Sequence, residues 1–123
     1  MIAGKTLQGW LDRADELGAE GRYFEAHEEL ELAWKGAGGE VKVLLQGLIQ
    51  IAAGLHRLRL HPEKIGGAFY LLDRGLEKLD RTRGLLAPEP LAALKAALRE
   101  VRASGAAPER LRFGLRAAEL AAE

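Results

Sequence analysis

The sequence predicts an all-α protein: a single domain, residues 1–123, of about six antiparallel helices around a buried central helix at about residues 40–60. Three observations lead to this prediction. Apolar residues recur at spacings of three and four along most of the chain, as on the buried side of a helix. No convincing strand pattern is present, and glycine and proline cut the chain into pieces joined by short connections, which favour antiparallel neighbours.

The first helix is predicted to begin after Thr6, because a threonine hydroxyl can cap a helix N-terminus. Gly18 and Gly21 mark a short break after it. A second helix is predicted from about Arg22 to Lys35, where the glycine-rich segment 36–39 provides a tight turn to the next helix.

The third helix is predicted from about Glu40 to Leu60 and is apolar over most of its circumference. Its polar exceptions share one narrow arc: Lys42, Gln46, Gln50 and Arg57. Gly47 and Gly54 are seven residues apart and therefore lie on one side of this helix. Because each glycine costs about 1 kcal/mol in a helix interior, the pair predicts that another backbone approaches closely there. The following His61-Pro62 ends the helix.

The remaining chain is divided in the same way. A fourth helix is predicted at about residues 63–83, and residues 84–90 form a linker with two prolines. A C-terminal helical pair is predicted at about residues 89–122, broken near Ser104 and restarted by Pro108. The leucines available to pack the sixth helix are Leu111, Leu115 and Leu120.

Composition narrows the range of functions. The formal net charge is zero, so a general electrostatic attraction to nucleic acid or to an anionic membrane is not expected. Residues 41–60 contain too many polar and charged side chains for a membrane span. The chain has no cysteine, which excludes disulfides and thiolate metal sites, and no signal-peptide pattern opens it. We expect a cytoplasmic protein.

The segment 23–34 is the most informative, because it places ionisable groups on a helix stripe that should be apolar. Tyr23, His27 and Trp34 share this stripe with Leu30, and Glu31 lies on its shoulder. An unpartnered buried polar group costs about 1–3 kcal/mol. His27 and Glu31 therefore need compensation, either from partners inside the protein or from a bound ligand.

Two interpretations of the His27/Glu31 pair remain open. The two side chains lie one helical turn apart, so they can bind one divalent metal ion together, with Glu28 as a third ligand. Alternatively, they belong to a buried polar network that Gln46 and Gln50 complete from the third helix. His56 is expected on the apolar side of that helix as a satisfied core histidine. These candidates and their neighbours are His27, Glu28, Glu31, Phe24, Trp34, Gln46, Gln50 and His56.

Established catalytic patterns are absent from the sequence. The Glu-x-x-His pairs of di-iron bundles fail, because phenylalanine and alanine occupy the positions three before His27 and His56. The zinc-protease pattern fails because the residue four after His27 is a glutamate. Gly-rich phosphate loops are missing, and no nucleophile stands out. No catalytic residue is predicted, and a metal-dependent hydrolase with Glu28 as base ranks last among the interpretations.

The same residues carry a resemblance to a known family. His27-x-x-x-Glu31-x-x-Trp34, preceded by Phe24-Glu25-Ala26, resembles the signature of the prokaryotic family named domain of unknown function 309. The segments 45–50 and 52–56 resemble its core-helix motif, and the similarity covers about residues 7–80. The resemblance implies a small all-α cytoplasmic fold. For function it implies only that the motif binds a metal ion through His27 and Glu31, with Trp34 as neighbour.

A second similarity points to a different class of protein. Gly21, Tyr23 and Ala26, followed by Leu30 and Ala33, resemble half of a tetratricopeptide repeat. Gly67, Ala68, Leu72 and Gly75 repeat this pattern about 42 residues later. Two such units fall short of a repeat array, but the pattern keeps protein binding open. The alternative function is therefore a helical-hairpin interaction module without catalytic activity, with another protein as partner and with a homodimer as its expected oligomeric state.

Overall fold

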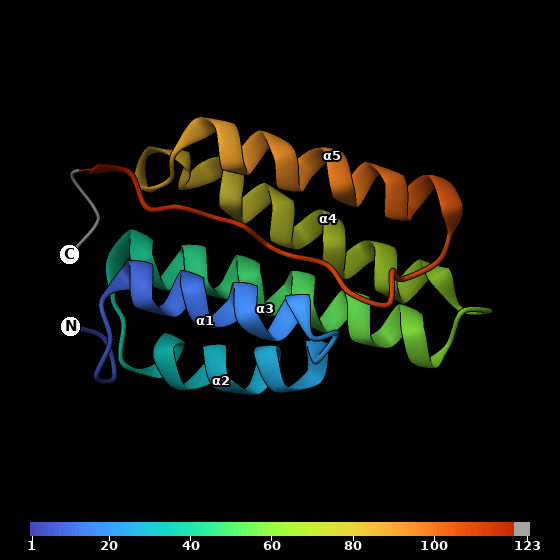
Figure 1. The fold of residues 1–123 in the computed structure, drawn as a ribbon, viewed down its shortest axis with the longest axis horizontal. Coiled ribbons are helices and arrows are strands. Elements are labelled where there is room, and N and C mark those ends of the chain that lie inside the picture. Colours follow the sequence, from blue (N-terminus) through green and yellow to red (C-terminus); the bar gives the residue numbers. More distant parts are fainter. Residues whose placement is uncertain (120–123) are drawn as a thin grey trace.

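The periodic apolar residues form five α-helices in the computed structural model, which describes residues 1–119 (Figure 1). The helices are α1 (Leu7–Ala19), α2 (Tyr23–Lys35), α3 (Gly39–Leu60), α4 (Ile65–Arg81) and α5 (Pro88–Ser104), with a short 3₁₀ turn at Arg83–Leu85. This part of the chain contains no β-strand, which confirms the all-α prediction. None of its helices combines the length and apolar character that crossing a bilayer requires.

The helix ends follow the predicted signals. The Thr6 hydroxyl accepts a hydrogen bond of 3.0 Å from the Gly9 backbone N–H and caps α1. His61 is the C-cap of α3, directly before Pro62. Gly105 ends α5 with a positive φ of 68°, a conformation that glycine adopts without strain. These local signals therefore set the element boundaries before any tertiary contact is considered.

Glycines bring α3 and α4 unusually close together, as the spacing of Gly47 and Gly54 predicts. A Cβ atom added to Gly47 would lie 2.9 Å from the carbonyl oxygen of Gly75 on α4. One added to Gly54 would lie 3.0 Å from the carbonyl oxygen of Ala68. From the other side, a Cβ on Gly75 would lie 2.6 Å from the Gly47 oxygen. The two backbones are therefore in direct contact.

α3 lies between α2 and α4 and buries one side only (Figure 1). Its buried apolar residues are Leu44, Leu45, Leu48, Ile51, Ala52, Leu55 and Leu58. On the opposite side, which we call the outer side, Gln46, Ile49 and Ala53 are only partly buried, and Arg57 is exposed. The prediction of a buried central helix is therefore not confirmed.

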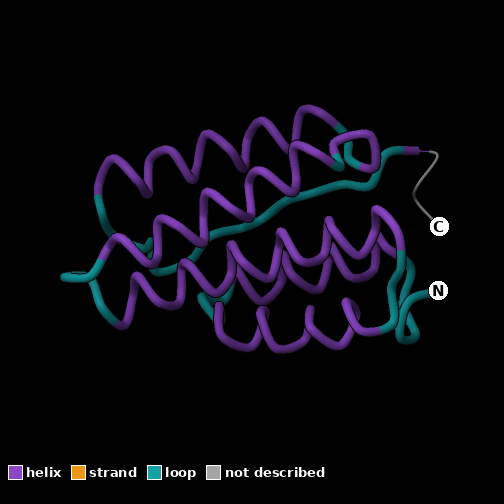
Figure 2. Tube along the Cα trace, turned by 180° about the vertical axis from the view of Figure 1, so that it is seen from behind, coloured by secondary structure: helices purple, strands orange, loops and turns teal. Residues whose placement is uncertain are grey.

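The predicted sixth helix is wrong, because residues 106–118, which we call the strap, form an extended segment. The strap runs between α1 and the α4–α5 pair, as both views show (Figures 1 and 2). Its inward residues Leu111, Phe113 and Leu115 alternate with exposed ones, a period of two that is typical of extended chain and not of a helix. Gly114, with a φ of 64°, also interrupts helical geometry. The predicted contribution of Leu120 lies outside the described residues.

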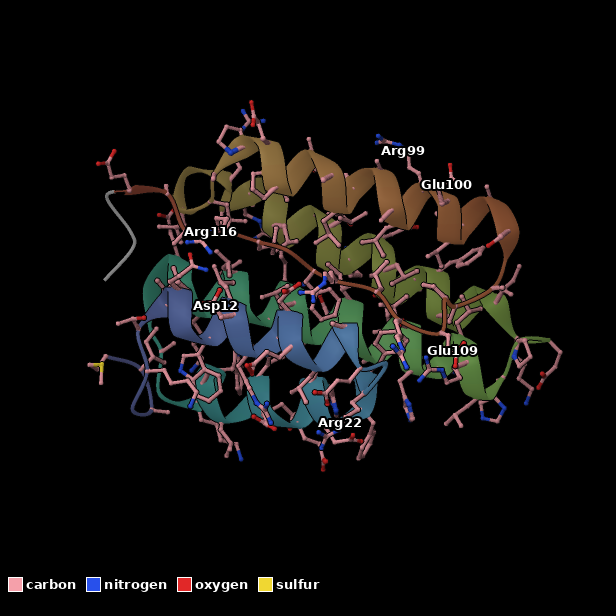
Figure 3. All side chains as sticks on the ribbon, viewed as in Figure 1. Asp12, Arg22, Arg99, Glu100, Glu109 and Arg116 are labelled. Atoms are coloured by element: carbon pink, nitrogen blue, oxygen red, sulfur yellow. The ribbon has the colours of Figure 1, made fainter. Side chains whose placement is uncertain are left out.

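Side chains of the first three helices hold the backbone of the strap. Tyr23 and Arg59 donate hydrogen bonds to the carbonyl oxygen of Pro108, of 2.7 and 3.2 Å. Asp15 accepts one from the Gly114 N–H, and Gln8 accepts one from the Ala117 N–H. These bonds replace the helical hydrogen bonds that the segment forgoes. Figure 3 shows a further contact, where Arg116 of the strap lies 3.8 Å from Asp12 of α1.

Gly75→Ala tests the close approach of α3 and α4. The added methyl group has no space, so we expect the free energy of unfolding to fall by about 1–3 kcal/mol in urea denaturation. Gly66→Ala is the matched control on the same helix, because nothing lies within 4 Å of its added Cβ. That variant should gain up to about 1 kcal/mol. Equal losses in both variants would contradict the proposed backbone contact.

Phe113→Ala tests whether the strap is part of the core. Phe113 is 1% exposed, so its truncation should lower the free energy of unfolding by about 3–5 kcal/mol, measured by the same method. Arg110→Ala, at an exposed position of the strap, should change it by less than about 0.5 kcal/mol. A small effect of Phe113→Ala would mean that the strap does not contribute to the folded core in solution.

Candidate functional site

The orientation of α2 decides where the motif side chains lie. The helix buries Tyr23, Ala26, Leu30 and Ala33, which recur at spacings of three and four. His27 and Trp34 lie next to this buried stripe and are only half-buried. The predicted buried stripe of Tyr23, His27, Leu30 and Trp34 is therefore wrong in its rotation about the helix axis. Ala26 and Ala33 complete the buried side in place of His27 and Trp34.

The motif residues lie together along one edge of α2, beside the outer side of α3. We call this group the motif surface; its members are Phe24, His27, Glu31 and Trp34 of α2 with Gln46, Ile49 and His56 of α3. The Phe24 ring lies 5.6 Å from the His27 ring and 5.0 Å from the His56 ring, between centroids. Phe24 is nevertheless 42% exposed, which is unusual for a large aromatic side chain.

His27 and Glu31 form the predicted pair but not in a buried network. The His27 Nε2 and Glu31 Oε1 atoms are 3.1 Å apart, and the two side chains are 26% and 46% exposed. Water therefore reaches both groups, and no buried polar partner is needed to compensate them. The prediction of a buried His/Glu/Trp cluster is wrong for this reason.

His56 lies at the opposite end of the motif surface from Trp34, packed on Phe24. Burial lowers the pKa of the His56 imidazole, and the neighbouring His27 and Arg59 lower it further. Both influences favour the neutral ring. A neutral imidazole can pack against an aromatic ring without the cost of burying a charge.

Trp34 and Glu31 line a shallow pocket of about 220 Å³ together with Lys35, Gln46 and Ile49. The Lys42 ammonium group lies 4.4 Å from the centroid of the Trp34 ring, at the distance of a cation–π contact. Lys42 is not among the predicted neighbours of Trp34, and Ile49 is predicted only as a member of the segment 45–50. A signal for Lys42 was present, since it shares the polar arc of the third helix with Gln46.

Gln50 and Glu28 do not join the motif surface in the predicted way. The Gln50 side-chain oxygen accepts a hydrogen bond of 2.9 Å from Lys78 of α4, on the far side of α3 from α2. Glu28 is exposed to solvent. Of the two glutamines predicted to approach Glu31, only Gln46 does so.

The ligand set of a metal ion is not assembled among residues 1–119. No group of three or more histidine, cysteine, aspartate or glutamate side chains has the geometry to hold a metal ion in this part of the chain. His27 and Glu31 supply two adjacent donor groups, whereas structural and catalytic zinc sites use three or four protein ligands. Metal binding by His27, Glu28 and Glu31 stays a prediction.

Comparison with known proteins gives a family match that covers most of α1 and all of α2 and α3. Residues 11–66 match the model of a family described as Domain of unknown function (DUF309). The chain contains a DUF309 domain. No curated protein and no solved structure matches the chain. The DUF309 match includes the whole motif surface, whereas nearly all of α4, α5 and the strap lie outside it.

His27→Ala separates a surface pair from a buried network in this DUF309 domain. For a partly exposed side-chain pair at i,i+4 we expect the free energy of unfolding to fall by less than about 1 kcal/mol in urea denaturation. A buried network would instead lose a few kcal/mol. Repeating the measurement with added Zn²⁺ tests the metal prediction, because a ligand stabilises only the form that binds it.

Proposed function

We propose that this DUF309 protein is a non-catalytic helical interaction module that forms a homodimer through the motif surface. The observation that carries the proposal is the exposure of the motif. Phe24 is 42% exposed on top of two imidazole rings, beside an open pocket walled by Trp34. Aromatic side chains, phenylalanine included, are enriched at the centres of protein interfaces, and exposed apolar groups that cluster mark such sites.

The threonine and serine hydroxyls of the chain support a non-catalytic role. The only threonines and the only serine are Thr6, Thr82 and Ser104. Thr6 caps α1, whereas Thr82 and Ser104 donate to the backbone carbonyl oxygens of Lys78 and Val101. A hydroxyl nucleophile needs an adjacent base, and here the hydroxyls of Thr6, Thr82 and Ser104 are engaged in local helix structure instead.

The oligomeric state tests the proposal. We expect sedimentation equilibrium of the wild type to give a dimer of the 13.4 kDa chain. Phe24→Ser should raise the dimer dissociation constant by about tenfold or more, because it removes a large apolar contact at the interface. A strictly monomeric wild type at high protein concentration would refute the homodimer.

Leu32→Ser is the matched control for Phe24→Ser. Leu32 is 58% exposed on the same helix but lies about 80° further around its axis than Phe24. It should therefore leave the dimer dissociation constant unchanged. Equal effects of both substitutions would show that general surface hydrophobicity, and not the motif surface, drives association.

A further inference from the structure

The outer side of α3 is bordered by helices of opposite character. On the α2 edge, Glu31 lies among the motif residues, with the exposed Glu28 three residues before it and Lys35 at the C-terminal end of this edge. On the α4 edge, Lys78 contacts Gln50 of α3. Two more cations lie on the same side of α4, because Arg74 and Arg81 are four residues before and three after Lys78. Arg74 has an acidic neighbour on its own helix, at 3.4 Å from Glu77.

The acidic and basic groups lie at matching levels along α3. Glu31 shares its pocket with Gln46 and Ile49 of α3. Lys78 lies at the same level on the opposite edge, since a Cβ on Gly47 would be 3.0 Å from the Lys78 Cβ. Glu31 and Lys78 therefore lie at the same height along α3, on opposite sides of it.

Phe24 and the Arg57 guanidinium group likewise lie at similar heights on opposite edges, nearer the C-terminal end of α3. Phe24 packs on His56 from the α2 edge. At the neighbouring level on the α4 edge, the guanidinium group of Arg57 lies over Gly67, so that an added Cβ there would be 2.8 Å from the Arg57 Cζ atom. Phe24 on one edge thus has a cationic surface opposite it on the other edge.

We infer that two copies of this chain pair face to face about a twofold axis parallel to α3, with α2 of each copy over α4 of the other. Such an axis exchanges the α2 edge with the α4 edge but leaves each residue at the same height along α3. It therefore places Glu31 against Lys78 of the second copy, and the Phe24 ring against the Arg57 guanidinium of the second copy. Twofold symmetry makes each of these contacts twice. This inference rests on the homodimer proposed above.

The surface approaches the size of a stable interface. α3 has 22 residues and is about 33 Å long, and two helix-to-helix spacings make the three-helix face about 16–20 Å wide. The flat projected area is then about 600 Å², before the corrugation of the side chains is counted. Stable interfaces bury about 800 Å² of accessible surface on each partner. The exposed Tyr70 on α4, which Arg74 covers, adds apolar area at its margin.

The pairing predicts that two charge-reversal variants, each impaired in dimerisation alone, form a dimer when they are mixed. Glu31→Lys alone and Lys78→Glu alone each create two like-charge contacts, so each variant should dissociate at least about tenfold more readily than the wild type. Mixing the two variants restores both contacts, because the lysine introduced at position 31 of one copy then faces the glutamate introduced at position 78 of the other. Sedimentation equilibrium of the mixture should therefore recover the dimer, and low salt should enlarge the difference.

A matched control uses charges far from this surface. Arg99→Glu and Glu100→Lys reverse exposed groups on α5, at the other edge of the molecule (Figure 3), and should leave dimerisation unchanged. Circular dichroism confirms that each variant is folded. A dimer that resists both reversals, or a mixture that stays monomeric, overturns this pairing while leaving the homodimer intact. A monomeric wild type overturns both.

Discussion

The contact between the backbones of α3 and α4 is the constraint on which the candidate site depends. It needs three glycines, because a methyl group at Gly47, Gly54 or Gly75 would enter the neighbouring helix. The close spacing brings Lys78 within hydrogen-bonding distance of Gln50 and lays Arg57 over Gly67. Without it, the basic edge of α4 would not follow the outer side of α3 at a defined register.

The second constraint is the small size of the residues with which α2 meets its neighbours. Ala26 and Ala33 are fully buried, so α2 lies close to the core and turns His27, Glu31 and Trp34 toward its edge. The motif is thereby kept at the surface, where water solvates the polar groups of His27 and Glu31. This placement explains why the stripe that contains His27 carries an ionisable group. The stripe that faces the core is the neighbouring one, which contains Ala26 and Ala33. It also supports recognition by contact as the role of the motif.

The strap shows how a short segment can complete a helical core without being a helix. Phe113 and Leu115 are almost fully buried, while Gln8, Asp15 and Tyr23 satisfy the strap backbone. Helical periodicity suggested Leu111 and Leu115 as one stripe, because a spacing of four fits a helix as well as an extended chain. Only the intervening Phe113 distinguishes the two, and its ring is buried beside Gly18 of α1.

The sequence by itself determined the class of fold, the approximate limits of each of the first five helices, the close approach at Gly47 and Gly54, and the DUF309 motif with its His27–Glu31 pair. These features depend on local capping, periodicity and residue size, which are properties of neighbouring residues along the chain. Only the tertiary structure decided that the pair is half-exposed, that Gln50 turns to Lys78, that α3 keeps an outer side, and that residues 106–118 are extended. The first three depend on how far one helix rotates about its axis or on which distant side chain offers a hydrogen bond, and no local signal encodes either. For the strap, the alternation of Leu111, Phe113 and Leu115 is a local signal, but the spacing of Leu111 and Leu115 also fits a helix, so only packing against α1 decides between the two.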